Sequence, residues 1–245
     1  MKTVGIMGGM GPMATARFYQ MLIELTDAHC DQEHIHVMID SVPELPDRTA
    51  HIMGKGRSPL QGMRLSLKRL ADMGAEVVAI PCNTAHYYFE SLEADDKIQL
   101  IHMVNETAQW IQKQSKIGKV GLLATSGTYY SELYQKAFSA CDKPLVLPRL
   151  EQQKELMRAI YAFKEGRRLE AEWIVNGVVK ELTALKVDAW ILGCTELPLI
   201  FSKQYGKIAL IDSSWILARK TIQISGAKLS ETDDFYKRMA VGPIS

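Results

Sequence analysis

The stretch EVVAIPCNTAH, residues 76–86, carries an apolar run that ends just before Cys82 and is followed by small polar residues. The stretch DAWILGCTELP, residues 188–198, repeats this arrangement around Cys194, about half the chain further on. Short apolar runs bounded by turn residues are typical of buried strands. Each stretch therefore predicts a strand, a turn that holds a cysteine, and the start of a helix. We expect two similar halves that each place one cysteine at a common site.

Strand and helix patterns alternate along the rest of the chain. Between the expected strands, apolar residues recur with the 3.6-residue period of helices. The expected strands cover about 3–7, 35–39, 77–80, 98–102, 119–124, 145–147, 189–193 and 207–211. Such alternation favours parallel sheets covered by helices. The predicted fold class is α/β, with two pseudo-symmetric domains, each a parallel-sheet α/β sandwich, and the active site in the cleft between them.

The glycine-rich turn after the first strand, GIMGGMGP at 5–12, is echoed by GLLATSGT at 121–128. We expect an N-terminal half at 1–115, a C-terminal half at 116–225 and a tail at 226–245. Part of the closing helix, 213–226, is a candidate to pack on the first half. In open parallel sheets, ligands bind beyond the carboxyl ends of the strands. Both cysteines and both glycine-rich turns lie at such ends, so one site between the halves collects all four.

The composition, 47% hydrophobic and 23% charged, is ordinary for a soluble globular chain. A net charge of +1 gives no electrostatic reason to expect nucleic acid or a membrane surface as partner. The first residues enter a strand pattern without an apolar signal segment, so we expect a cytoplasmic protein. The four cysteines show no C-x-x-C or zinc spacing, so no metal site is expected. Cys30 and Cys141 are interpreted as small, partly buried apolar residues.

The two turn cysteines favour proton transfer at carbon. A thiolate is the reactive form of cysteine, and a helix N-terminus lowers a thiol pKa. Since both Cys82 and Cys194 precede an expected helix, we expect both to be activated in this way. One thiolate then removes a proton from a carbon, and the opposite thiol delivers a proton to the other face, which inverts a stereocentre. No cofactor is needed if backbone N–H groups and cations stabilise the charge that develops on an adjacent carboxylate.

The motif PCNTAH at 81–86, together with GCTELP at 193–198, resembles the aspartate/glutamate racemase superfamily. The opening GIMGGMGPMAT, 5–15, narrows the resemblance to the aspartate racemase branch, and the likeness covers about 1–225. It implies an amino-acid racemase that works without pyridoxal phosphate or another cofactor, commonly a homodimer, with Cys82 and Cys194 as the acid/base pair. Glutamate racemases usually carry His where Glu196 stands. This favours aspartate, while glutamate and a broader specificity stay open.

The resemblance also implies the residues that bind the amino-acid substrate. Arg48 resembles the family's arginine for the side-chain carboxylate, which suits a bidentate guanidinium. Lys164 resembles the lysine that contacts substrate from the second half. The other expected substrate-binding residues come from the turns: Met10, Asn83, Thr84, Ala85, Thr125, Thr195 and Glu196. His86 is expected to cap its helix or face solvent rather than to tune Cys82.

Other functions compete with this interpretation. The pattern Gly9-x-Gly11-x-x-Ala14 loosely matches a dinucleotide fingerprint and would suit an NAD-dependent oxidoreductase. However, Asp40 ends the second strand later than that fingerprint expects, Pro12 lies inside the turn, and the paired cysteines stay unexplained. Hydantoin racemases, maleate isomerases and arylmalonate decarboxylases use similar cysteines, but a basic pair favours an acidic substrate. A binding protein without catalysis would not need two thiols.

Overall fold

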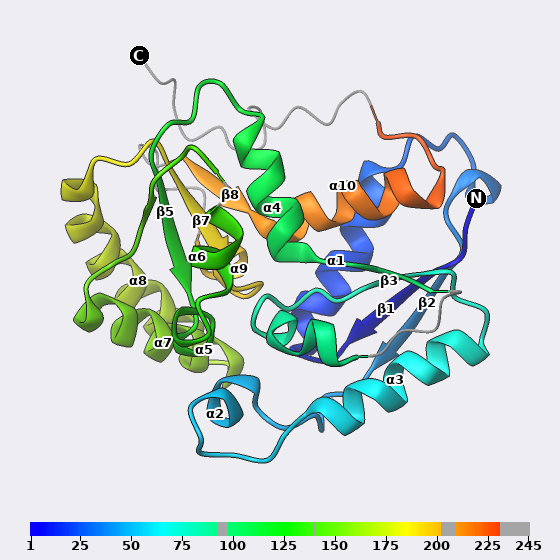
Figure 1. Ribbon diagram of the computed structural model, residues 1–245, viewed down its shortest axis with the longest axis horizontal. Coiled ribbons are helices and arrows are strands. Elements are labelled where there is room, and N and C mark those ends of the chain that lie inside the picture. Colours follow the sequence, from blue (N-terminus) through cyan, green and yellow to red (C-terminus); the bar gives the residue numbers. More distant parts are fainter. Residues whose placement is uncertain (93–97, 140, 202–208, 231–245) are drawn as a thin grey trace.

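The computed structural model describes residues 1–92, 98–139, 141–201 and 209–230, and it contains two four-stranded parallel sheets (Figure 1). The first sheet has the order β2-β1-β3-β4, from strands β1 (Val4–Gly8), β2 (Val37–Ser41), β3 (Val77–Ala79) and β4 (Gln99–Ile101). The second has the order β6-β5-β7-β8, from β5 (Val120–Ala124), β6 (Leu145–Val146), β7 (Ala189–Gly193) and β8 (Leu210–Asp212). The same order in both sheets confirms the predicted fold class of two related parallel-sheet α/β halves.

Helices connect the strands of each half. The first half carries α1 (Pro12–Leu25), η1 (Asp31–Glu33), α2 (Arg48–Ile52), α3 (Leu60–Asp72), η2 (Thr84–Ser91) and α4 (Met103–Gln112). The second carries α5 (Ser126–Tyr130), α6 (Leu133–Phe138), α7 (Leu150–Lys164), α8 (Arg168–Leu182), η3 (Thr183–Leu185), α9 (Leu197–Ile200) and α10 (Ser213–Ser225). None of the helices in the described ranges is both long and apolar enough to cross a bilayer.

The central strands of both sheets are buried along their whole length. All five residues of each of β1, β5 and β7 are buried, as expected for parallel strands covered on both faces. Their apolar runs therefore lack the polar alternation of a half-exposed strand. The first turn of α1 follows from Pro12, whose missing N–H costs nothing at the first helical position. Thr15 closes this turn, because its hydroxyl accepts from Gly9 N at 2.9 Å and donates to Gly11 O at 3.0 Å.

Helices of both halves share the apolar layer between the two sheets. This central layer combines α1, α4, α6 and α10 in one continuous core. The helix α4 follows a strand of the first half but packs on α6, whereas α10 follows a strand of the second half but packs on α1 and α4. Trp110 of α4 meets Trp215 of α10 edge to face at 5.6 Å. The outer faces are covered separately, the first sheet by α3 and η2 and the second by α7 and α8.

Several expected elements differ in detail. The loop after β2 contains the short helix α2, and the helix expected after Cys82 is the 3-10 helix η2. The segment between β5 and β6 forms two short helices, α5 and α6, because Glu132 adopts a left-handed backbone with φ 57° between them. The last strand begins at Leu210, and 207–208 of the predicted strand lie outside the described residues. The predicted tail is described only to 230, where Leu229 pairs antiparallel with Thr26.

Candidate active site

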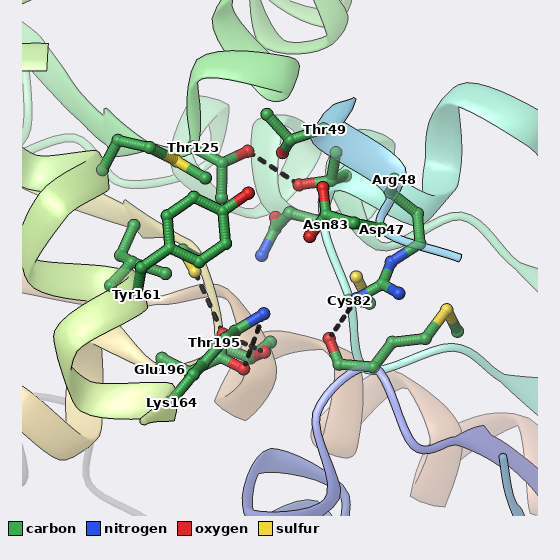
Figure 2. Close-up of a pocket in the computed structure, with 15 residues that line it drawn as sticks. Asp47, Arg48, Thr49, Cys82, Asn83, Thr125, Tyr161, Lys164, Thr195 and Glu196 are labelled. Atoms are coloured by element: carbon green, nitrogen blue, oxygen red, sulfur yellow. Dashed lines mark hydrogen bonds and ion pairs between the residues drawn. The ribbon is translucent and has the colours of Figure 1, made fainter. Parts of the chain in front are cut away.

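The turns that follow the central strands of the two sheets line one pocket (Figure 2). The pocket holds about 350 Å³ of atom-free space, part of it open to solvent. Its lining consists of Met10, Asp47, Arg48, Thr49, Cys82, Asn83, Thr84, Thr125, Met157, Ile160, Tyr161, Lys164, Cys194, Thr195 and Glu196. Each half contributes one cysteine.

Every predicted site residue except Ala85 lies in this lining. Ala85 is fully buried in the core on the α3 side of the first sheet, because its position on η2 turns it away from the pocket. The sequence-based prediction missed two groups, Asp47 and Thr49 beside Arg48, and three side chains of α7. Met157, Ile160 and Tyr161 precede Lys164 by seven, four and three positions. This is the spacing of one helix face. The predicted position of Lys164 in the site could therefore have indicated that these three side chains lie there too.

Cys82 lies in a tight turn that is braced by a buried histidine. Its N–H donates to Ile80 O at 2.7 Å, and its carbonyl accepts from Ala85 N at 3.2 Å. His86 lies behind the turn, with Nδ1 at 2.9 Å from the same carbonyl and Nε2 accepting from Met103 N at 3.0 Å. Because Nε2 accepts a hydrogen bond, Nδ1 carries the hydrogen and donates a hydrogen bond to Cys82 O.

His86 therefore neither caps a helix nor faces solvent, contrary to the expectation from sequence. Only 2% of its surface is exposed. Burial, reinforced by the neighbouring His102, lowers the pKa of His86 to about 4. The imidazole is thus a neutral hydrogen-bonding brace for the cysteine turn.

Cys194 is held as a thiol. Its Sγ donates to Glu196 Oε2 at 3.1 Å, and both side chains are buried. Burial raises the pKa of Cys194 well above its usual value, and the Glu196 carboxylate raises it further, while Lys164 opposes the rise. The expected activation by a following helix is wrong for this cysteine. The helix α9 has only four residues and begins three positions later, so desolvation and a carboxylate decide the proton.

Glu196 connects the cysteine to a cation. Lys164 Nζ lies 3.4 Å from Glu196 Oε1, and the Thr195 hydroxyl donates to Oε2 at 3.3 Å. Burial opposes the charge on Lys164, but Glu196 and the two cysteines outweigh it and raise the pKa of the ammonium. Gly11 sits against the same carboxylate, since an added Cβ would lie 3.2 Å from Oε1. The site thus contains a charged cation on the second half.

Arg48 is fixed by backbone carbonyl groups. Its Nη1 donates to Leu45 O at 3.2 Å and to Pro46 O at 3.1 Å, and Nη2 donates to Met10 O at 3.2 Å. Its Nε is buried and has no hydrogen-bond partner among the described residues. A buried donor without a partner is costly. The guanidinium is therefore held in place at the wall of the pocket by backbone carbonyl groups.

Asp47 and Tyr161 flank this arginine from opposite halves. The Asp47 carboxylate caps α2 by accepting from Ala50 N at 2.7 Å. Partial burial raises the pKa of the Tyr161 phenol, and the nearby Asp47 raises it further. Tyr161 thus presents a neutral hydroxyl beside the Asp47 carboxylate (Figure 2).

Three threonine hydroxyls connect the halves, and two of these residues, Thr84 and Thr125, line the pocket. Thr84 Oγ1 lies 2.8 Å from Thr125 Oγ1 and 3.0 Å from Thr128 Oγ1, which are themselves 3.0 Å apart. Thr125 Oγ1 also accepts from Thr128 N at 3.1 Å. Gly127 makes this approach possible, because a Cβ there would lie 2.9 Å from the Cα of Thr49.

The glycine-rich turn is packed against protein. Gly9 has φ 88°, and a Cβ on it would lie 2.4 Å from the backbone of Val42. With Gly11 against Glu196, the glycines serve internal packing, which gives a structural reason for the loose dinucleotide pattern. In the described parts of the chain, no group of three or more His, Cys, Asp or Glu residues is placed to hold a metal ion.

Comparisons with known proteins give consistent similarities. A family model described as Asp/Glu/Hydantoin racemase matches residues 7–221. An aspartate racemase structure from Picrophilus torridus superposes with a TM-score of 0.87 and 32% identity, covering 96% of this chain and 99% of the other. An aspartate racemase homologue from Pyrococcus horikoshii gives a TM-score of 0.72 and 28% identity, covering 92% and 100%.

The curated proteins include a relative with wider specificity. The broad specificity amino-acid racemase RacX of Bacillus subtilis is 28% identical over 225 residues, which cover 89% of this chain and 96% of the relative. These similarities give no support to a dinucleotide oxidoreductase.

Proposed function

Because the chain belongs to the Asp/Glu/hydantoin racemase family and is an amino-acid racemase, an isomerase, we propose that it interconverts L- and D-aspartate with Cys82 and Cys194. The observation that carries this proposal is that two buried cysteines, one from each half, line the same pocket. Inversion of a stereocentre requires proton transfer on both faces of one carbon. Two separate strand ends supply the two faces.

The proton balance of the reaction is closed. In one direction, the Cys82 thiolate removes the Cα proton, and the electron pair of the C–H bond moves into the α-carboxylate to form an enediolate. The Cys194 thiol then gives its proton to the opposite face of Cα and becomes a thiolate. One proton leaves the substrate and one enters, so no redox partner is required. The reverse direction starts with Cys194 as the base.

The hydrogen bond from Cys194 to Glu196 supports a defined resting state. Since Cys194 is buried and donates to a carboxylate, it begins as the proton donor. Lys164, which opposes the rise in the pKa of Cys194, would stabilise the thiolate that forms after donation. The Glu196–Lys164 pair thus serves both protonation states.

Arg48 supports an acidic substrate. Its guanidinium is held in place at the wall of the pocket, and a guanidinium suits a side-chain carboxylate. In this proposal Asn83, Thr84 and Thr195 hold the α-carboxylate and amino groups. Glu196 helps to hold these groups, Lys164 contacts the substrate from the second half, and Met10 and Thr125 line the floor.

Broader amino-acid specificity is the second candidate, favoured by the similarity to a broad-specificity racemase; glutamate is the alternative acid. The proposal includes catalysis without a cofactor, a homodimer, a cytoplasmic location and halves at 1–115 and 116–225, as the resemblance and the repeated strand pattern suggest. No nucleic-acid or membrane partner forms part of it.

A chiral assay across the common amino acids tests the proposal. The purified protein, in cofactor-free buffer made with deuterated water, should convert L-aspartate to the D-enantiomer and place deuterium at Cα. Preference for glutamate would correct the substrate and keep the mechanism. If no amino acid changes configuration, the proposed reaction is wrong.

A further inference from the structure

The side chain of Asn83, next to Cys82 in the chain, is held by two residues outside the pocket lining. The Tyr134 hydroxyl of α6 donates to Asn83 Oδ1 at 2.6 Å. Asn83 Nδ2 donates to Ser213 Oγ of α10 at 3.0 Å, and Ser213 Oγ donates to Leu192 O at 2.7 Å. All three side chains are buried, so water does not compete for these bonds.

The direction of each bond in this chain follows from the backbone carbonyl at its end. A carbonyl only accepts, so the single hydrogen of Ser213 points to Leu192 O. Ser213 must then accept from Asn83, which places the amide nitrogen toward Ser213. The amide oxygen consequently faces Tyr134, which donates its hydrogen. A flipped amide would set two acceptors against each other at Ser213.

Tyr134 is suited to act as a permanent donor. Its side chain is fully buried, and burial raises the pKa of the phenol far above its usual value, although the hydroxyls of Thr107 and Ser213 oppose the rise. The hydroxyl therefore keeps its proton around neutral pH. With Oδ1 occupied by Tyr134, the polar group of the Asn83 side chain that remains for the pocket is the second N–H of Nδ2.

We propose that Tyr134 is a positioning residue that orients the Asn83 amide so that an N–H, and not the C=O, faces the α-carboxylate of the substrate. This rests on the proposed function, in which that carboxylate gains negative charge as the proton leaves Cα. A donor at this position stabilises the enediolate, whereas a carbonyl oxygen would repel it. Tyr134 belongs to the second half and Asn83 to the first, so the contact also joins the two halves beside Cys82.

Tyr134→Phe tests the inference, because it removes the hydroxyl and keeps the buried ring. Tyr129→Phe is the matched control, since the Tyr129 hydroxyl is also buried but, among the described residues, bonds to backbone alone, to Leu122 O and Ala124 N. Two unreactive aspartate analogues serve as probes. 2-Methylaspartate has both carboxylates but no α-hydrogen, and β-alanine lacks the α-carboxylate.

The expected result is selective. Tyr134→Phe should weaken inhibition by 2-methylaspartate by roughly 10-fold, as expected for a hydrogen bond to a charged group, and lower kcat by at least about as much. Inhibition by β-alanine should stay within about 2-fold, and Tyr129→Phe should leave the ratio of the two analogues unchanged. Equal weakening of both analogues, or of neither, would overturn the inference.

A spectroscopic measurement on the wild-type protein keeps the inference testable if Tyr134→Phe folds poorly. It also tests the inference separately from the proposed reaction. In the wild-type protein, the two ¹⁵N-bound hydrogens of the Asn83 side chain, assigned with Asn83→Asp, should respond differently to 2-methylaspartate. The pocket-facing hydrogen should shift, and the one bonded to Ser213 should not. Equal response of both would contradict the assignment of the amide. If the proposed function were wrong, the wild type would not racemise any amino acid. The inference would still be testable, because Tyr134→Phe should change the Asn83 amide signals without any turnover.

Discussion

Acidification should destabilise the fold through His86 in a measurable way. His86 is neutral in the folded protein because burial lowers its pKa from 6.5 to about 4. In the unfolded chain the imidazole regains its ordinary pKa and takes up a proton below about pH 6.5. Between these values the unfolded state binds more protons, so the free energy of unfolding falls as the pH falls. The contribution is complete above pH 6.5 and is lost as the pH drops toward 4.

The size of the effect follows from the same pKa values. Each pKa unit of the shift corresponds to about 1.4 kcal/mol. The shift of the His86 pKa from 6.5 to about 4 therefore lowers the free energy of unfolding by about 3 kcal/mol once the pH has fallen below both values. By about pH 5, roughly 2 kcal/mol of this should be gone. Since the side chain is only 2% exposed, solvent screening does not reduce the figure much. For a domain with a stability of roughly 5–15 kcal/mol, this is a large fraction.

Urea unfolding of the wild type and His86→Gln, followed by tryptophan fluorescence at one protein concentration, measures the effect. Glutamine keeps one of the two buried hydrogen bonds, so the variant should be less stable by about 1–2 kcal/mol near neutral pH. The two stabilities should converge as the pH falls, because glutamine does not titrate. His36→Gln, at an exposed position, is the control and should track the wild type. Parallel curves for His86→Gln and the wild type between about pH 7 and pH 5 would refute the reasoning.

Four further predictions concern the site and its packing. Cys82→Ala and Cys194→Ala should each lower racemisation by at least about 1000-fold in a chiral assay, because each removes an acid/base group. Cys141→Ala, outside the pocket lining, is the control and should keep its activity. Near wild-type activity in either site variant would exclude the two-base mechanism. Arg48→Lys should lower kcat/KM for aspartate by roughly 10- to 100-fold, since lysine cannot reproduce the fork of donors, and an equal loss on a neutral amino acid would make Arg48 structural. Glu196→Gln removes a charge that raises the pKa of Cys194, so the thiolate absorbance of that cysteine, measured in Cys82→Ala, should appear at lower pH; an unchanged titration would contradict the assigned cause. Gly127→Ala should destabilise the protein by about 1–3 kcal/mol in urea unfolding because its Cβ would meet Thr49, whereas Gly177→Ala, with open space around it in α8, should stabilise by up to about 1 kcal/mol.

The sequence carried the main features of the fold because the strands of buried parallel sheets leave a strong apolar signal. The runs at β3 and β7, and the cysteine after each, predicted two related halves and a common pocket. Arg48 and Lys164 were found through the resemblance to a family, since a charged residue on a polar surface carries no distinguishing local pattern.

What the sequence concealed depends on packing between the halves. Ala85 lies in a motif with the cysteine, but the tight turn of η2 directs it to the core. The pKa of Cys194 depends on burial and on the conformation of Glu196. The helix pattern after the cysteine indicates neither of them. Tyr134 reaches Asn83 across the two halves, and no spacing along the chain indicates such a contact.

The central layer has a consequence for how the chain can be divided. Because α4 packs on the second half and α10 on the first, a break near 115 would produce two fragments that each lack a helix partner supplied by the other. Each fragment alone would expose the apolar surface that α4 and α10 bury, including Trp110 and Trp215. The two pieces should therefore be aggregation-prone when produced separately and should regain structure when co-expressed.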